Sequence, residues 1–121
     1  MKDKKNEFAA LPYPEMIKNL SKIEIPIDGI QGWLLQSKTK QVVFFDIEPV
    51  GKMPDHSHCA QWGIMLAGEM ELTIAGQTKI YRKGDSYFIP DGVIHSANFP
   101  SHVNVIDVFD DTNRYSIKGE S

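Results

Sequence analysis

The sequence predicts an all-β domain, built as a sandwich or barrel of short strands. From Ile23 onward, turn-forming residues recur at the spacing of roughly 8–12 residues that is typical of such folds. The segments between the turns are rich in β-branched and aromatic residues, which favour strands over helices. The chain has 121 residues, of which 41% are apolar, enough for one domain with a buried core.

Each expected strand is separated from the next by a turn signal. The clearest case is the segment in which Met70, Leu72 and Ile74 alternate with polar residues, because a period of two leaves one face buried. Gly-containing turns at 67–69, 75–77 and 83–85 divide this part of the chain into hairpins. The expected strands span residues 32–36, 41–48, 61–67, 70–74, 78–82, 86–89, 93–98, 102–109 and 114–118, with a further strand through the histidines after Pro54.

Residues 1–25 read as an N-terminal arm that precedes a barrel domain over residues 26–118. Residues 11–14, Leu-Pro-Tyr-Pro, restrict the backbone to extended forms, and residues 15–20 could form a short helix. The arm carries Phe8, Leu11, Tyr13 and Met16, which need a surface to cover them. They could lie along the barrel or against a second subunit, and we expect a homodimer.

The composition excludes several classes of partner. The net charge is -3, and no basic stripe could meet a phosphate backbone, so nucleic acid is not expected. No apolar run is long enough to span a bilayer, and no apolar segment of a secretory signal follows the basic start. Cys59 is the only cysteine, which excludes disulfides within the chain and fits a cytoplasmic protein.

Three of the four histidines form a candidate metal site. His56 and His58 are two positions apart, so both imidazoles leave an extended chain on the same side. Two neutral imidazoles held in this way can bind one divalent transition metal, with a third ligand from elsewhere in the fold. His95 is suited to that role. The alternative is that the three rings line a barrel without binding metal.

Two short motifs around these histidines resemble those of the cupin superfamily, in its small single-domain microbial form. The first motif is matched by Gly51, His56, His58 and Gly68. The second is matched by Gly84, Pro90, Gly92, His95 and Asn98. Gln61 stands where the family usually has glutamate, and only two residues separate it from His58 where three or four are usual. The resemblance implies a double-stranded β-helix, or jelly roll.

The resemblance also implies one divalent metal on the three histidines, with Gln61 as the fourth ligand. Zn, Ni, Mn and Fe all accept imidazole, so the ligand types leave the metal open. Three imidazoles and one amide oxygen form a neutral set, which leaves the full charge of the dication to polarise a carbonyl or bind a carboxylate. That favours isomerisation, ring opening or lyase-type chemistry over oxygen chemistry. Alternatively, Gln61 orients a histidine through a hydrogen bond.

Asp107, Phe109 and Arg114 resemble a group found in the small cupins of pectin and alginate breakdown, which open the ring of unsaturated uronates. Arg114 stands one residue later than in that group. The resemblance implies that Asp107 is a general acid or base and that Arg114 holds a substrate carboxylate. The alternative is a structural pair between Asp107 and Arg114 at the barrel mouth.

These observations predict a metal-dependent enzyme acting on a small polar substrate, such as a sugar acid or another carbohydrate derivative. A non-enzymatic cupin that binds a metal or small ligand is one alternative, and a small-molecule dioxygenase is another. The position of Asp107 distinguishes the first two, because a catalytic carboxyl must face the metal inside the barrel. We also expect Met65, Tyr87 and Phe88 to line the barrel, and His102 to be exposed.

Overall fold

The structure, a computed structural model, describes residues 12–119, which form two antiparallel sheets and one short helix. The helix is α2 (Glu15–Lys18). The strands are β1 (Ser21–Lys22), β2 (Ile30–Gln36), β3 (Gln41–Ile47), β4 (Gly51–His56), β5 (Gln61–Ala67), β6 (Met70–Ile74), β7 (Gln77–Tyr81), β8 (Ser86–Ile89), β9 (His95–Phe99) and β10 (Val103–Phe109). None of the helical structure in residues 12–119 has the length and apolar character needed to cross a membrane.

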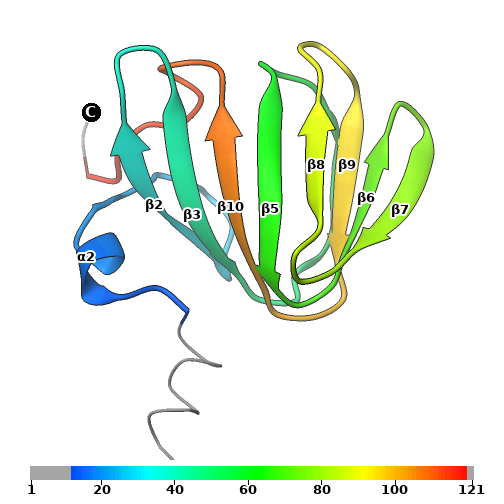
Figure 1. Cartoon of the computed structure of the whole chain (residues 1–121), viewed down its shortest axis with the longest axis horizontal. Coiled ribbons are helices and arrows are strands. Elements are labelled where there is room, and N and C mark those ends of the chain that lie inside the picture. Colours follow the sequence, from blue (N-terminus) through cyan, green and yellow to red (C-terminus); the bar gives the residue numbers. More distant parts are fainter. Residues whose placement is uncertain (1–11, 120–121) are drawn as a thin grey trace, which may run out of the picture.

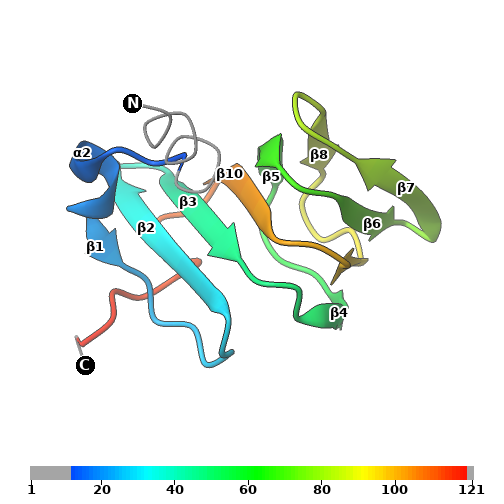
Figure 2. The same ribbon diagram turned by 90° about the horizontal axis from the view of Figure 1, so that it is seen from below.

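The two sheets form the expected jelly roll. Six strands run in the order β1-β2-β3-β10-β5-β8, and four run in the order β4-β9-β6-β7. Figure 1 shows β2, β3, β10 and β5 side by side, and Figure 2 shows the same sheet from below. Because β10 is paired on both edges, with β3 and with β5, it is an interior strand of the larger sheet.

Alternation along the strands builds the core. In β3 every second residue is buried, so Val43, Phe45 and Ile47 face inward. The same period places Val105 and Phe109 of β10 on the inner face. Burying these large apolar side chains supplies the main drive for folding, at roughly 25 cal/mol per Å² of apolar surface.

The strands expected from the sequence are confirmed to within about two residues, apart from the histidine strand and the last. The histidine strand was expected after Pro54, but β4 already begins at Gly51 and ends at His56. Residues 114–118 were expected to be a strand, and this prediction was wrong, since they make only an isolated bridge between Ile117 and Ile23. The physical reason is that the Tyr115 N–H bonds to the Gln41 side-chain oxygen, 2.9 Å away, instead of to a neighbouring strand.

The N-terminal segment lies along the outer face of the larger sheet. The buried Tyr13 hydroxyl donates to the Phe45 carbonyl oxygen at 2.7 Å, and its ring meets the edges of Trp33 and Phe44. Met16 is 76% exposed, whereas Phe8 and Leu11 lie outside the described residues. The strand β1 joins the sheet although it falls within the expected arm. The domain boundary and the homodimer stay predictions.

Phe88 corrects another expectation, because it lies on the outside of the barrel and is 58% exposed. The alternation in β8 turns its neighbours Tyr87 and Ile89 inward. Trp62 of β5 pairs with Phe88 in register and is also exposed. Met65 and Tyr87 are buried, as expected.

A polar cluster on the outer face of the larger sheet links the segment before β10 to β3. The His102 Nε2 atom lies 2.6 Å from Asp46 Oδ1, and Glu48 lies 3.8 Å from the other ring nitrogen. Asp46 also accepts hydrogen bonds from Gln31 and Asn104. Asp46, Glu48 and His102 lie close enough together to hold a metal, but the Asp46 carboxylate already accepts several hydrogen bonds. His102 is exposed, as expected, and its partners were not foreseen.

This cluster makes stability depend on pH. The hydrogen bond to Asp46 raises the pKa of His102 above its ordinary 6.5. Burial pushes the pKa of Asp46 up, but hydrogen bonds from His102 and two amides outweigh it and hold the pKa below its ordinary 3.8. The contribution of His102 is therefore complete below pH 6.5 and is lost as the pH rises through the higher folded-state pKa. That of Asp46 is present above pH 3.8 and is lost as the pH falls through the lower folded-state pKa.

We expect His102→Asn to lower the free energy of unfolding by at most about 1 kcal/mol near pH 6, because solvent screens this partly exposed pair. Near pH 9 the cost should vanish, since the imidazole is then neutral in both states. Urea unfolding of both proteins at the two pH values measures it. Asp110→Asn is the control, because it removes an exposed ion pair, with Lys40, that contains no histidine. An equal cost of His102→Asn at both pH values would contradict the assignment.

Candidate functional site

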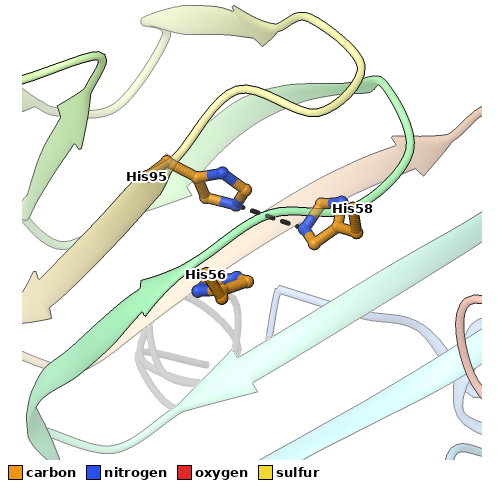
Figure 3. Close-up of side chains that lie close together, drawn as sticks. All are labelled: His56, His58 and His95. Atoms are coloured by element: carbon orange, nitrogen blue, oxygen red, sulfur yellow. Dashed lines mark hydrogen bonds between the residues drawn. The ribbon is translucent and has the colours of Figure 1, made fainter.

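Three histidine side chains meet at the open end of the barrel, on elements that come from both motifs. His56 ends β4, His95 begins β9, and the two residues pair in register. His58 lies just beyond β4, in the loop that leads to β5. Its carbonyl oxygen accepts a hydrogen bond from the Gly92 N–H at 2.9 Å, which ties the two motif loops together. Figure 3 shows the three rings turned toward one another.

The rings are close enough to share one ion. The His56 and His95 ring centroids lie 4.2 Å apart, and the Nε2 atoms of His58 and His95 are separated by 3.2 Å (Figure 3). In all three residues, one ligand nitrogen lies within 4.8 Å of those of the other two. The expectation that these histidines converge is confirmed by this geometry, although the strand ends at His56 and does not reach His58.

Backbone carbonyls fix the tautomer of each ring. The Nδ1 atoms of His56, His58 and His95 contact the carbonyl oxygens of Pro54, Cys59 and Val93 at 3.0, 2.8 and 3.0 Å. A carbonyl oxygen only accepts, so each Nδ1 carries the proton. The Nε2 lone pairs are then free to act as metal ligands, and an N–H bonded to a carbonyl is the usual partner of a ligating histidine.

The environment keeps two of these rings neutral. Burial lowers the pKa of His58 to about 4, and the nearby Arg114 guanidinium also lowers it. Burial likewise lowers the pKa of His95, with a further contribution from His56. Two neutral rings whose Nε2 lone pairs face each other at 3.2 Å lack a proton to share. A cation between them resolves that repulsion, so these residues fit a divalent metal.

The histidines open onto a cavity of about 670 Å³ inside the barrel. Its polar lining includes Gln61, Asp107 and Arg114, so the site residues expected from the sequence share one chamber with the histidines. Cavities of this volume take small organic ligands. The remaining walls are mostly apolar.

Asp107 points into this chamber from the middle of β10, and its side chain is buried. The Tyr87 hydroxyl donates a hydrogen bond to Asp107 Oδ1 at 2.5 Å. Burial raises the pKa of Asp107 to about 6, although hydrogen bonds from Tyr87 and Gln61 oppose the rise. A carboxyl with such a pKa can both take up and release a proton near neutral pH.

Gly63 makes the contact between Tyr87 and Asp107 possible. Register places Asp107, Gly63 and Tyr87 in one row across β10, β5 and β8. The two side chains start two strands apart, roughly 10 Å, and meet over the glycine. A Cβ atom at Gly63 would overlap Asp107 Oδ1 and the end of the Tyr87 ring. Neither Gly63 nor Tyr87 was expected to be a site residue; a glycine inside an apolar strand was the available signal.

Arg114 reaches the chamber from the segment after β10. Its guanidinium lies 4.4 Å from the Tyr115 ring centroid and 5.8 Å from that of Phe109. Its buried Nε has no hydrogen-bond partner within the part of the chain that the structure describes. The alternative of an Asp107–Arg114 pair is not realised among residues 12–119, because the partner of Asp107 is Tyr87.

Gln61 begins β5 on the same wall as Asp107. Burial raises the pKa values of Asp107 and Tyr87, and the nearby Gln61 side chain opposes both rises. Gln61 lines the same cavity as the three histidines. Its role as a fourth metal ligand stays a prediction.

Comparison with known proteins identifies the family. Residues 43–109, more than half of the chain, match the sequence profile of the cupin domain family. This chain belongs to the cupin family. None of the curated protein sequences matches it.

Solved structures agree with this cupin assignment. An RmlC-like cupin from Shewanella frigidimarina is 26% identical, with a TM-score of 0.69, and the match covers 78% of this chain and 86% of that one. KdgF from Halomonas sp. is 18% identical, with a TM-score of 0.65 and coverage of 75% and 87%. Oxalate decarboxylase from Bacillus subtilis is 22% identical, with a TM-score of 0.65, but the match covers 80% of this cupin and only 29% of that longer chain. The last two likenesses show the fold alone.

Removal of one imidazole should empty the proposed metal site. We expect the wild-type cupin to carry about one equivalent of metal and His56→Ala to carry about a tenth or less, because two rings bind far more weakly than three. Elemental analysis of the purified proteins measures this. His102→Ala is the matched control, since it removes a histidine outside the cavity. Equal metal content in wild type and His56→Ala would rule out the site.

Gly63→Ala should cost about 2–3 kcal/mol of unfolding free energy, because the new methyl group displaces the Tyr87 ring and the Asp107 carboxyl. Gly76→Ala is the control: its Cβ meets no atom within 4 Å, and the cost of its positive φ of 84° is about 1 kcal/mol. Urea unfolding compares the two. Similar losses of unfolding free energy in both variants would contradict the prediction, because they would show that the Tyr87–Asp107 contact does not need the space above Gly63.

Proposed function

We propose that this cupin is a metal-dependent enzyme that acts on a small carboxylate substrate, such as a sugar acid or another carbohydrate derivative. One observation carries the proposal. Asp107 and Arg114 face the cavity of the three histidines without pairing with each other, so an acid–base group and a cation are both free to meet a ligand. A purely structural role would be met by an Asp–Arg pair.

His56, His58 and His95 would hold one divalent metal, with Gln61 as the fourth ligand and Zn, Ni, Mn or Fe as the ion. When bound, the metal supplies Lewis-acid activation of a carbonyl or hydroxyl oxygen. The three Nδ1–carbonyl contacts keep the Nε2 atoms aimed at a common point. Preorganised ligands of this kind lose little entropy on binding.

Asp107 would move the proton. Its Oδ1 atom is held by the Tyr87 hydroxyl, which leaves Oδ2 for the substrate. The carboxylate takes a proton from one substrate atom and, as the acid, returns it to another. That exchange is what an isomerisation or a ring opening requires. Burial keeps water from competing for the carboxyl.

Arg114 would orient the substrate. A guanidinium binds a carboxylate through two parallel hydrogen bonds, and the buried Nε of Arg114 has no partner within the described residues. The rings of Tyr115 and Phe109 lie beneath its planar head, which limits the directions it can take. A carboxylate held there would share the cavity with the histidine rings, because Arg114, His58 and His95 all line it.

The substrate class rests on two supports. The residues Gln61, Asp107, Phe109 and Arg114 resemble those of the cupins that open unsaturated uronates, and the fold resembles KdgF of Halomonas sp.. We therefore propose ring opening of an unsaturated uronate as the first reaction to assay. A non-enzymatic binding cupin remains the alternative, and the assay distinguishes it.

Asp107→Asn should lower kcat on an unsaturated uronate by about 100-fold or more, because the amide cannot accept the proton. Metal content should stay near that of wild type. Asp110→Asn, an exposed neighbour that pairs with Lys40, is the matched control and should keep full activity. Loss of the substrate's ring absorbance measures the rate. Binding of uronates by the metal-loaded protein without turnover would instead favour the non-enzymatic cupin.

A further inference from the structure

The residues proposed to bind metal, move a proton and hold a carboxylate gather at one end of the cavity. The polar end carries His56, His95, Asp107 and Arg114. From these residues, each step of two along a strand moves roughly 7 Å further into the barrel. On β9 the steps after His95 are Ala97 and Phe99, and both line the cavity.

The other strands show the same change. On β10, the inward residue one step beyond Asp107 is Val105, which also lines the cavity. On β3, which pairs with β10 in the same sheet, Phe45 and Ile47 line it. Met53 of β4 closes the same end from the smaller sheet. Three strands, β4, β9 and β10, therefore turn apolar within one step of the residues proposed to bind metal or move a proton, and β3 adds apolar side chains beside β10.

This apolar end could not bind a sugar ring. Sugar hydroxyl groups need hydrogen-bond partners, and burying one without a partner costs roughly 1–3 kcal/mol. Within residues 12–119, the one buried side-chain polar atom left unpaired is Arg114 Nε, at the polar end. The volume of about 670 Å³ also exceeds what a single small sugar acid fills.

We propose that the cavity contains an apolar subsite, lined by Met53, Ala97, Phe99, Phe45 and Ile47, and that the ligand is an amphipathic carboxylate. Its charged head meets Arg114 and the metal ligands, and an apolar chain or ring extends past Ala97 toward Phe99. Ala97 is the small side chain that leaves this path open. The inference rests on the proposed function for the carboxylate end, and it narrows the substrate class from sugar acids in general to those with an apolar group.

A series of straight-chain carboxylates tests the subsite: acetate, butyrate, hexanoate and octanoate, titrated calorimetrically into the zinc-loaded protein. Each methylene that enters an apolar site should tighten binding by about threefold to fourfold. The heat-capacity change should become more negative with chain length. Equal affinity along the series, or no binding of the longer members, would overturn the proposal.

Two variants separate the ends of the ligand. Arg114→Gln should weaken every member by a similar factor of about ten or more, because each loses the same charged contact. Met53→Gln should leave acetate unchanged and reduce the gain per methylene. Met16→Gln is the matched control, an exposed methionine far from the cavity. An unchanged gain in Met53→Gln would contradict the assignment of the subsite.

If Met53→Gln fails to fold, the gain in affinity per methylene is instead compared between two other variants. Ile27→Asn changes a residue of the cavity rim, and Ile94→Asn changes an exposed residue outside the cavity lining. The readout is binding, so it is independent of catalysis. A steep chain-length dependence without uronate turnover would retain the subsite and reject the proposed reaction. Uronate turnover together with equal affinity for all the carboxylates would support the proposed reaction and reject the subsite.

Discussion

The register of β10 is the constraint on which the rest of the structure depends. The strand is bonded on both edges, and its alternation turns Val103, Val105, Asp107 and Phe109 inward together. A shift of one residue would expose that apolar set and remove Asp107 from the chamber at the same time. The forces that stabilise the core therefore also position the acid–base group.

The two sheets contribute different chemistry. The smaller sheet and its loop provide the histidines, through β4, β9 and the segment at His58. The larger sheet provides Gln61, Tyr87 and Asp107 through β5, β8 and β10. A ligand in the cavity is consequently held between a wall that can bind metal and a wall that can move a proton. The proposed site is complete only when both sheets enclose the cavity.

Local patterns in the sequence were sufficient for most of the fold. Glycine-containing turns and period-two alternation located the strands. The spacing of His56 and His58, together with the resemblance of the segment around His95 to a cupin motif, located the candidate metal site. What local patterns could not reveal was the row Asp107–Gly63–Tyr87, because it depends on which strands are neighbours. The face of Phe88 was missed for a related reason: β8 has only four residues, too few to define an inner side without its partners. Tyr115 bonds its backbone to the Gln41 side chain, which no strand pattern can anticipate, and within the described residues only Ser116 and Lys118 pair with the backbone of residues 22–24.

The carbonyl partners of the three histidines lie within two residues of each ring, at Pro54, Cys59 and Val93. Ring orientation is thus set mainly by short stretches of backbone, although the His58 ring also packs edge-on against Phe109 of the larger sheet, with 5.7 Å between the ring centroids. Substitutions at Gln61, Asp107 or Arg114 can alter substrate and reaction while the imidazoles keep their aim. Because of this division, evolution or protein engineering can change the side chains of the larger sheet for new chemistry and keep the histidines of the smaller sheet unchanged.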